Sequence, residues 1–380
     1  SIPDPFRTIN VVDGSFSSLD NQPIYYDSSG KKIQAGWRYN KKEEFKYVSD
    51  LIRDPMPDEQ HANWIVNKIK ELENTKASNP FFLGIGFVKP HTPLYAPKKY
   101  FDMFPLDEII LPEIKNGDID DTHYKDVYPP SEMGINYYNK LKLSFPGNEG
   151  LKKFLRAYLA CIAFMDDQVG KVLNALENSK FSENTIVVFT SDHGWQMGQK
   201  EYLYKNSPWE ESTKIPMIIK TPQKQLGEVL EPVSLIDIYP TLIDLCKLQK
   251  TNSESNLEID GNTLYPLLKK PNSKSWAGSE GALTLLGVGI NKPIDGLAIN
   301  KNKSAPWHIE IIKDLDNSYI KKQNYTIRTR DFRYILYKDG SEELYDHRDD
   351  PEEWNNLSSL KKYRKLKEKL RKQLIDKLNV

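Results

Sequence analysis

The sequence has few cysteines, no net charge and no apolar run long enough to cross a membrane. Two cysteines in 380 residues cannot build a disulfide framework, so cysteine usage leaves the redox compartment open. The 53 Lys and Arg residues balance 53 Asp and Glu residues, which argues against nucleic acid as the main partner. The absence of an apolar run of about 20 residues argues against a membrane span. What remains is a globular composition, with length enough for one large and one smaller domain.

The first residues, SIPDPFRTIN, also lack two features of a natural start. They contain neither an initiator Met nor a basic-then-apolar leader pattern, so we expect a cut end. The two cysteines, Cys161 and Cys246, each follow an apolar helical pattern. Both are therefore predicted to be ordinary buried thiols.

Hydrophobic periodicity predicts an α/β fold. Helical spacing of apolar residues predicts helices that begin near 54–60 and cover 151–177, 234–248 and 358–378. Continuous apolar runs predict buried strands at 80–87, 184–190 and 215–220. The expected buried stripe of the second helix consists of Leu155, Leu159, Ile162, Met165, Val169, Val172 and Leu176. Strands that alternate with helices imply a mostly parallel sheet sandwiched by helices.

The pattern changes after about residue 270. Residues 325–347 predict two antiparallel strands joined through Asp339-Gly340, and the Lys-rich helix at 358–378 is expected to present a solvated charged face. We therefore predict a catalytic α/β domain at 1–270 and a smaller α+β subdomain with an antiparallel sheet at 271–380.

Two of the apolar runs end in polar clusters that could carry chemistry. Lys89 and His91 follow the first, with prolines on both sides of the imidazole, and Asp192 and His193 follow the second. Ligands in such sheets bind outside the carboxyl ends of the strands. A lone His is more often a packed or solvated residue, and Asp-His-Gly is compatible with a simple turn. Asp192 suits a hard cation and His193 a transition metal, whereas Lys205 suits an anionic group.

These residues resemble the second signature of the type I sulfatases, which belong to the alkaline phosphatase superfamily. The closest resemblance is to the iduronate-sulfatase-like branch, and it covers roughly residues 50–380. The segments that carry it, in family order, are FFLGIGFVKPHTPLYAPKKYFDMFP, AYLACIAFMDDQVGKVL, SDHGW with Lys205 and Trp209, DIYPTLIDL, DGNTLYPLL and RTRDFRYILYKDGSEELYDHRDDPEEWNNL.

The resemblance implies a role for each of several residues. Asp192 and His193 would bind a divalent cation, most often Ca²⁺ in the family, and His91 and Lys205 would act on the sulfate. Lys89, Trp195 and Trp209 would contact substrate. The resemblance further implies a sulfated sugar or polysaccharide as substrate, and a secreted, periplasmic or lysosomal location.

The family nucleophile is not found in this sequence. Sulfatases use a formylglycine made from a Cys-x-Pro-Ser-Arg motif, and neither Cys161 nor Cys246 lies in one. Ser191 adjoins the predicted site, but no neighbouring residue is evidently placed to activate it. The resemblance also leads us to expect an earlier strand and two further Asp ligands, so we expect an N-terminal fragment of the same protein to complete the sheet. The isolated chain is then predicted to be inactive.

Two other functions stay open at this point. One is a phosphodiesterase or phosphonate hydrolase of the same superfamily, with a different nucleophile. The other is a non-catalytic remnant that binds sulfated glycans. The identity of the nucleophile segment distinguishes all three.

Overall fold

The chain packs as two compact units, described here from a computed structural model. The first contains Ser1–Ile114, Pro130–Val187 and Met197–Leu203, and the second contains Lys115–Pro129, Val188–Gln196 and Tyr204–Val380. The structure describes residues 15–21, 24–26, 32–34, 46–75, 79–123, 133–222, 226–248, 259–278, 280–286 and 323–378. These units interleave along the chain. The predicted division at residue 270 follows a change in sequence pattern and stays a prediction.

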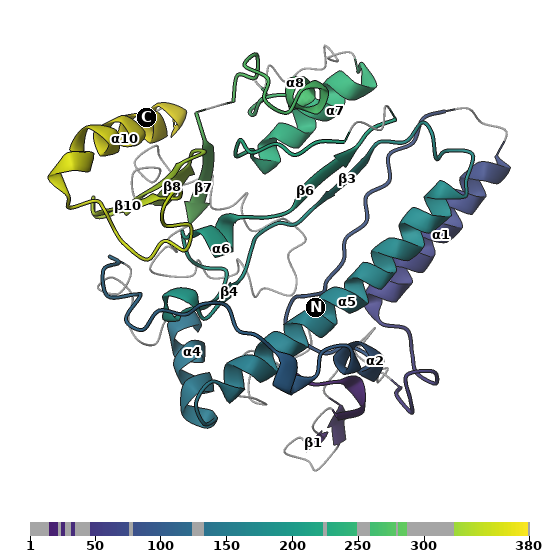
Figure 1. Cartoon of the computed structure of the whole chain (residues 1–380). Coiled ribbons are helices and arrows are strands. Elements are labelled where there is room, and N and C mark those ends of the chain that lie inside the picture. The colour runs from purple at the N-terminus through teal and green to yellow at the C-terminus, as the bar shows by residue number, and fades with distance from the viewer. Residues whose placement is uncertain are drawn as a thin grey trace, which may run out of the picture. The chain divides into compact units, whose positions relative to one another are not determined.

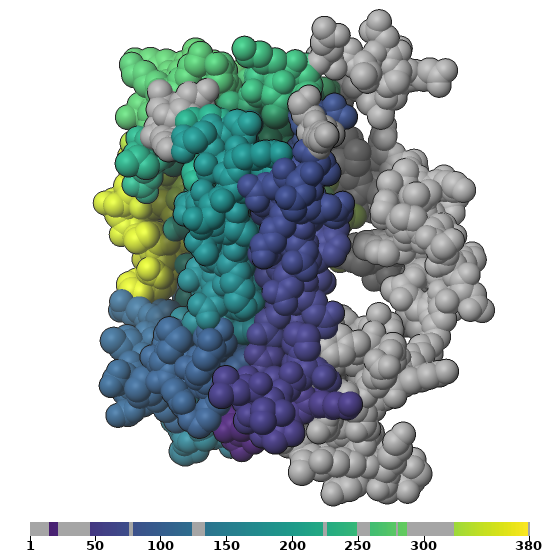
Figure 2. Space-filling model, turned by 90° about the vertical axis from the view of Figure 1, so that its right-hand side faces the viewer, coloured from purple at the N-terminus to yellow at the C-terminus, as the bar shows by residue number. Residues whose placement is uncertain are grey.

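Two long helices form the frame of the first unit. They are α1 (Pro57–Asn74) and α5 (Glu149–Glu177), which lie side by side in Figures 1 and 2. Glu59 fixes the start of α1, because one carboxylate oxygen accepts the backbone N–H of Met56 at 2.7 Å and both oxygens pair with Arg53. Both helices were predicted from their apolar periodicity, and both predictions are confirmed.

The predicted buried stripe of α5 is wrong for most of its members. Of the seven residues, Leu176 is buried and the other six are only partly covered. The buried face carries Leu151, Phe154, Ala157, Cys161 and Phe164 instead. Helices α1 and α2 (Lys98–Asp102) both contact α5, and Tyr100 of α2 packs edge-on against Phe164 with ring centroids 5.4 Å apart. The helix α5 is apolar on two faces, and the contacts with its neighbours determine which face is buried.

The run 80–87 was predicted to be a buried strand, and the structure differs. The segment is assigned to no strand, and Phe82 is 84% exposed. Alternate residues do pack inward, since Leu83 and Ile85 contact a cluster that contains Ile65, Ile69 and Leu176. One face of an extended apolar segment is thus covered, and the other face lies open within the described part of the chain.

The remaining elements of the first unit are short. The helix α4 (Met133–Ser144) lies in a part of the chain for which the sequence predicted no element. The other elements here are η2 (Leu19–Asn21), β1 (Ile24–Tyr26), β2 (Lys32–Gln34), η3 (Leu106–Glu108) and η4 (Gln199–Glu201). Strands β1 and β2 pair antiparallel. Strands β4 (Gln196–Met197) and β5 (Leu203–Tyr204) also pair with each other.

The second unit contains a four-stranded antiparallel sheet in the order β10-β9-β8-β7. Its strands are β7 (Ala282–Leu286), β8 (Asn324–Arg328), β9 (Phe332–Leu336) and β10 (Glu342–Asp346). The prediction of two strands over 325–347 is therefore wrong, because a turn at 329–331 splits the first of them. The predicted turn at Asp339-Gly340 is confirmed, and Gly340 adopts a φ of 89° there.

The C-terminal helix covers one face of this sheet. It is α10 (Arg364–Leu378), preceded by η7 (Lys361–Tyr363), and it lies beside the sheet strands in Figure 1. Leu370 and Leu374 are buried against Tyr325, Tyr334 and Leu344 of the strands. The predicted amphipathic helix is confirmed, and its charged residues stay at the surface.

The rest of the second unit surrounds a two-stranded sheet. Strand β3 (Val187–Thr190) pairs with β6 (Met217–Lys220), as expected from two of the apolar runs. The helical elements are α6 (Glu210–Thr213), η5 (Leu235–Asp237), α7 (Ile238–Cys246) and α8 (Tyr265–Lys269). Residues of β6 pack with Leu264, Leu267 and Trp276. Cys161 is buried as predicted, but Cys246 at the end of α7 is exposed, so that prediction is wrong.

The described elements make a mixed α/β fold with an antiparallel sheet near the C-terminus, in agreement with the predicted fold class. None of the helices in the described residues is long and apolar enough to cross a membrane.

Candidate active site

Polar side chains follow the end of β3, as the sequence indicated. Asp192 is largely exposed, with 83% of its side-chain surface accessible, and His193 is half-buried. Oδ2 of Asp192 lies 3.6 Å from Nε2 of His193. The Ser191 hydroxyl donates to the carbonyl oxygen of His193 at 3.1 Å, which helps to hold this turn. Two potential ligand atoms are thus close enough for one cation to contact both.

The hydrogen bonds of His193 determine its tautomer. Nδ1 lies 2.9 Å from the carbonyl oxygen of Gly194, which can only accept, so Nδ1 carries the proton. Nε2 is therefore the acceptor nitrogen, and Nζ of Lys205 lies 2.8 Å from it. A backbone hydrogen bond at Nδ1 is a common way to orient a ligand imidazole. The structure thus brings together three of the predicted site residues, Asp192, His193 and Lys205.

Gly194 allows this turn to pack tightly against α6. Its N–H donates to the carbonyl oxygen of Ser212 at 2.8 Å, and the next N–H donates to that of Glu211 at 2.6 Å. A Cβ atom at Gly194 would lie 2.1 Å from the carbonyl oxygen of Glu211. Only glycine therefore fits between His193 and Trp195 at this approach.

The donor set around Asp192 fits part of a divalent cation site. A carboxylate oxygen is an ordinary ligand of Ca²⁺ and Mg²⁺, whereas an imidazole nitrogen is a more usual ligand of transition metals. Calcium takes about 6–8 oxygen ligands. The pair at Asp192 and His193 would therefore supply a minority of the coordination.

His91 and Lys89 lie in the first unit, in a loop whose Lys89–Pro90 and Thr92–Pro93 bonds are cis. Nδ1 of His91 donates to the carbonyl oxygen of Thr92 at 2.6 Å, and this hydrogen bond does not involve the other ring nitrogen, Nε2. Lys89 is buried, where its ammonium donates to the carbonyl oxygen of Pro93 and lies 3.9 Å from the ring centroid of Tyr95. Burial lowers the pKa of Lys89 below its ordinary value. The action of His91 on the sulfate and the contact of Lys89 with the substrate stay predictions.

The two predicted substrate-binding tryptophans lie in different surroundings. Trp195 is half-buried and packs edge-on against Tyr204, with ring centroids 5.0 Å apart. Trp209 is only 1% exposed, and its indole N–H donates to Glu343 at 3.0 Å. The Trp209 ring is therefore part of the protein interior. Contact of either tryptophan with substrate stays a prediction.

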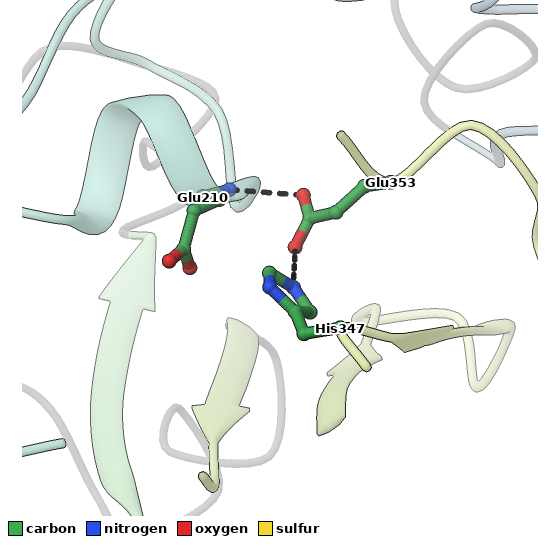
Figure 3. Close-up of side chains that lie close together, drawn as sticks. All are labelled: Glu210, His347 and Glu353. Atoms are coloured by element: carbon green, nitrogen blue, oxygen red, sulfur yellow. Dashed lines mark hydrogen bonds and ion pairs between the residues drawn. The ribbon is translucent and has the colours of Figure 1, made fainter. Parts of the chain in front are cut away.

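Sequence reasoning missed a buried ion network in the second unit, drawn in part in Figure 3. Glu353 accepts from His347 Nε2 at 2.8 Å, from Arg333 Nε at 2.5 Å and from the backbone N–H of Glu210 at 2.9 Å. The carboxylate of Glu210 pairs with Arg333 and, at 3.0 Å, with Arg328. Arg328 also lies 2.9 Å from Nδ1 of His347. Only the acid-rich and Arg-rich composition of 328–353 hinted at such a network, because no sequence spacing indicates contacts with Glu210.

Three of these residues, Glu210, His347 and Glu353, place ligand atoms within 4.8 Å of one another. The guanidinium of Arg333 already bridges the two carboxylates, and its side chain is 1% exposed. Burial alone would raise the pKa of Glu210, but Arg333 and Arg328 outweigh burial and lower it to about 2. The positive charges that a metal would supply are therefore present as guanidinium groups. We interpret the cluster as a structural ion network.

Comparison with known proteins identifies the family. The family model described as Sulfatase matches residues 13–248, which is more than half of the chain. The chain belongs to the sulfatase family. The matched range contains every predicted site residue, including the turn after β3 and the loop with His91.

Two curated relatives and one solved structure illustrate the similarity. A sulfatase of Formosa agariphila is 33% identical over 332 residues, which cover 85% of this chain and 54% of that protein. Mouse iduronate 2-sulfatase is 30% identical over 239 residues, covering 53% and 42%. Phosphonate monoester hydrolase of Agrobacterium radiobacter shares the fold, with a TM-score of 0.63, 23% identity and coverage of 84% and 60%. The chain spans about half the length of the curated relatives it matches.

None of the thiols and hydroxyls near these sites is evidently a sulfatase nucleophile. Burial raises the pKa of Cys161 to about 11, and its thiol faces the carbonyl oxygen of Tyr95. Cys246 ends α7 and is followed by Lys247 and Leu248, not by a Pro-Ser-Arg sequence. The Ser191 hydroxyl donates to the backbone carbonyl of His193 at 3.1 Å, and its contact with Oδ1 of Asp192 is long, at 3.5 Å.

Proposed function

We propose that the protein carrying this chain is a sulfate ester hydrolase that acts on a sulfated sugar or polysaccharide. One observation supports it above the others. In a member of the sulfatase family, an exposed carboxylate, an acceptor imidazole and a lysine ammonium gather at the end of β3. Similarity to an iduronate 2-sulfatase favours a carbohydrate sulfate. A secreted, periplasmic or lysosomal location belongs to the same proposal.

In this proposal Asp192 and His193 hold a divalent cation, which we take to be Ca²⁺. The exposure of Asp192 and its distance of 3.6 Å from Nε2 of His193 support these roles. Because Nε2 has a single lone pair, the ammonium of Lys205 must leave it when the cation binds. A bound cation would offset the charge of the sulfate oxygens. Oxygen ligands from other residues must complete its coordination, because calcium prefers about 6–8 of them.

Lys205 and His91 contribute to the sulfate transfer itself in this proposal. The ammonium of Lys205 stabilises negative charge that develops on the sulfuryl oxygens. A protonated His91 donates a proton to the ester oxygen as the sulfate leaves, which is general acid catalysis. The hydrogen bond from Nδ1 of His91 to Thr92 supports this role, because it orients the ring and leaves Nε2 as the proton donor. Lys89, Trp195 and Trp209 are proposed to line or support the substrate pocket.

We further propose that an N-terminal segment of the same protein supplies the nucleophile as a formylglycine. The curated relatives are about twice as long as their matched regions, which leaves room for such a segment. Phe82 is exposed in an unpaired extended run, and the residues at 155–172 of the predicted α5 stripe are only partly covered. Such apolar surface is suited to a further strand and its neighbours.

The test is a hydrolysis assay on a chromogenic aryl sulfate and on sulfated oligosaccharides. The chain alone should be inactive, and addition of the N-terminal segment with a matured cysteine should give metal-dependent turnover. Sustained turnover by the lone chain, shown free of other polypeptides by mass spectrometry, would overturn the nucleophile proposal. Preferential hydrolysis of a phosphonate monoester or phosphodiester would favour the alternative enzyme of the superfamily. Tight binding of sulfated glycans without turnover would favour a non-catalytic role.

A further inference from the structure

The C-terminal segment carries a concentration of positive charge. Residues 361–377 contain nine Lys or Arg and two acidic residues, a net charge of +7, whereas the whole chain has a formal net charge of zero. Such an imbalance creates a local field that attracts anions even when the protein as a whole is neutral. The position of these charges on α10 determines whether they can act together.

Four lysines form a stripe along this segment. Lys362, Lys365, Lys369 and Lys372 recur at steps of three and four residues, which is the spacing of one helical face. All four are exposed. With a rise of about 1.5 Å per residue, the stripe is roughly 15 Å long. It therefore presents a row of ammonium groups to solvent.

The opposite face of the helix is fixed to the protein. Leu370 and Leu374 are buried against the sheet, and Leu366, Ile375 and Leu378 pack around them. The apolar face is thus already covered, which removes the main contribution to insertion of an amphipathic helix into a lipid surface. The packing also gives the lysine stripe one defined orientation.

Other basic residues nearby are neutralised, but those of the stripe are not paired with acids. Arg364 pairs with Glu368 at 3.0 Å, and Lys367 pairs with Glu342 at 2.7 Å. Among the described residues, no carboxylate forms an ion pair with Lys365, Lys369 or Lys372. Asp376 lies on the same face at its C-terminal end, and Glu368, one helical turn from Lys365 and Lys372, pairs with Arg364. The charge of the stripe is therefore available to a ligand.

We propose that this lysine stripe is an anchoring surface for a sulfated polysaccharide chain. This proposal rests on the proposed function, because that function makes sulfated carbohydrate the anion that the protein must hold. A row of point charges suits a flexible chain with repeated anionic groups. The ring of Tyr363 lies beside the stripe, 4.8 Å from the ammonium of Lys362, but it packs against the sheet cluster. Single-stranded nucleic acid sites instead add aromatic side chains on which bases stack. The stripe would keep a polymeric substrate near the enzyme between successive reactions.

The experiment compares binding to immobilised heparin by two variants of the protein that carries this chain. In the first, the four stripe lysines are replaced by glutamine (Lys362→Gln, Lys365→Gln, Lys369→Gln and Lys372→Gln). Glutamine retains high helix propensity, and thermal unfolding checks that the fold is kept. The matched control removes the same number of exposed charges elsewhere (Lys140→Gln, Lys142→Gln, Lys270→Gln and Lys274→Gln).

We expect the stripe variant to bind heparin at least about tenfold more weakly than wild type at physiological salt, with a shallower dependence on salt concentration. The control should bind within about twofold of wild type, because its lysines come from two separate segments of the chain and do not form one row of four charges. Hydrolysis of a small aryl sulfate should be equal in all three proteins. Chemically desulfated heparin should bind wild type weakly.

Several results would overturn the proposal. They are unchanged heparin binding by the stripe variant, an equal loss in the control, and equal binding of desulfated heparin. Equal affinity for phosphatidylserine vesicles or for DNA would show a general anion surface in place of a sulfated-glycan one. If wild type does not hydrolyse aryl sulfate, the proposed function fails, whereas the heparin comparison still decides the role of the stripe.

Discussion

The ammonium of Lys205 lies 2.8 Å from Nε2 of His193. The other ring nitrogen of His193 donates to the carbonyl oxygen of Gly194, so the contact with Lys205 uses the lone pair of a neutral imidazole. The same nitrogen is 3.6 Å from Asp192. One cationic side chain and two potential metal ligands therefore meet at a single point of the second unit, and this arrangement gives testable consequences for each of them.

The first prediction concerns the charge of Lys205. Replacement by methionine keeps the length of the side chain and removes its ammonium, so Lys205→Met should lower kcat on an aryl sulfate by about a hundredfold or more. Lys205→Arg should retain part of the activity, because it restores the charge with a different shape. Steady-state kinetics with elemental analysis of the same samples separates catalysis from metal loss. An activity of Lys205→Met close to wild type would remove Lys205 from the site.

The second prediction concerns the cation. Asp192→Ala should abolish divalent-cation binding and nearly all turnover, because the remaining imidazole is a poor ligand for a hard cation. Ser191→Ala is the matched neighbour control, since it removes a hydrogen bond to a backbone carbonyl and a long 3.5 Å contact with Oδ1 of Asp192 but leaves both candidate ligands in place. This control should keep its metal, measured by elemental analysis, and its activity. Unchanged metal content in Asp192→Ala would contradict the ligand assignment, and an inactive Ser191→Ala would make Ser191 a nucleophile candidate.

Much of the helical frame could be predicted from sequence, because amphipathic periodicity directly reflects burial on one side. The helices α1 and α10 fit this rule, and their buried residues Ile65, Ile69, Leu370 and Leu374 recur at helical spacing. The buried face of α5 could not be predicted, because that helix has apolar residues around most of its circumference. Which face of α5 is buried depends on its contacts with other helices, and the periodicity of a single helix gives no information on those contacts.

Part of the candidate site could also be predicted from the sequence, and part could not. The closeness of Asp192 and His193 follows from adjacency at the end of a strand, and the family resemblance added Lys205. The network of Arg333 with Glu210 and Glu353 needed coordinates, because 123 residues separate Arg333 from Glu210. Isolated Arg and Glu residues in a sequence most often lie on the surface, so composition alone favoured a solvated region.

A third prediction concerns the buried carboxylate of Glu343, which holds Trp209 in place. One oxygen accepts from the backbone N–H of His123 at 2.8 Å, and the other accepts from the indole N–H of Trp209 at 3.0 Å. Tyr337 and Tyr345 donate one hydroxyl to each oxygen. In Glu343→Gln the amide nitrogen must face one of two N–H groups that cannot accept. The variant should therefore lose about 1–3 kcal/mol of unfolding free energy.

Trp209→Phe provides the test of this explanation, because it removes the indole donor. With Trp209→Phe present, the glutamine can point its nitrogen toward position 209, so Glu343→Gln should cost less than in the wild-type background. A double-mutant cycle measured by chemical denaturation gives this coupling. Burial raises the pKa of Glu343, so the folded protein binds this proton more readily than the unfolded chain does. Wild type therefore gains stability on acidification that Glu343→Gln cannot gain, and the cost of the substitution should increase as the pH falls. Additive effects of the two substitutions would contradict the assigned role of Trp209.

The last prediction concerns acid stability and the guanidinium of Arg333. The pKa of Glu210 is lowered to about 2 because Arg333 and Arg328 outweigh the opposite effect of burial, and the pKa of Glu353 is also lowered. A carboxyl group with a lowered pKa stabilises the fold above its unfolded pKa of about 4.3, and this contribution is lost as the pH falls toward about 2.

Arg333→Met leaves two buried carboxylates without their shared partner, so it should lose about 3–5 kcal/mol of unfolding free energy at pH 7. In this variant the loss should become smaller between pH 7 and 5, because protonation relieves the carboxylates. Arg330→Met is the control, since Arg330 forms an exposed pair with Glu231 at 3.4 Å and should lose no more than about 1 kcal/mol. Chemical denaturation of both variants across this pH range measures the difference, and equal losses at pH 7 would show that the buried network does not stabilise the fold.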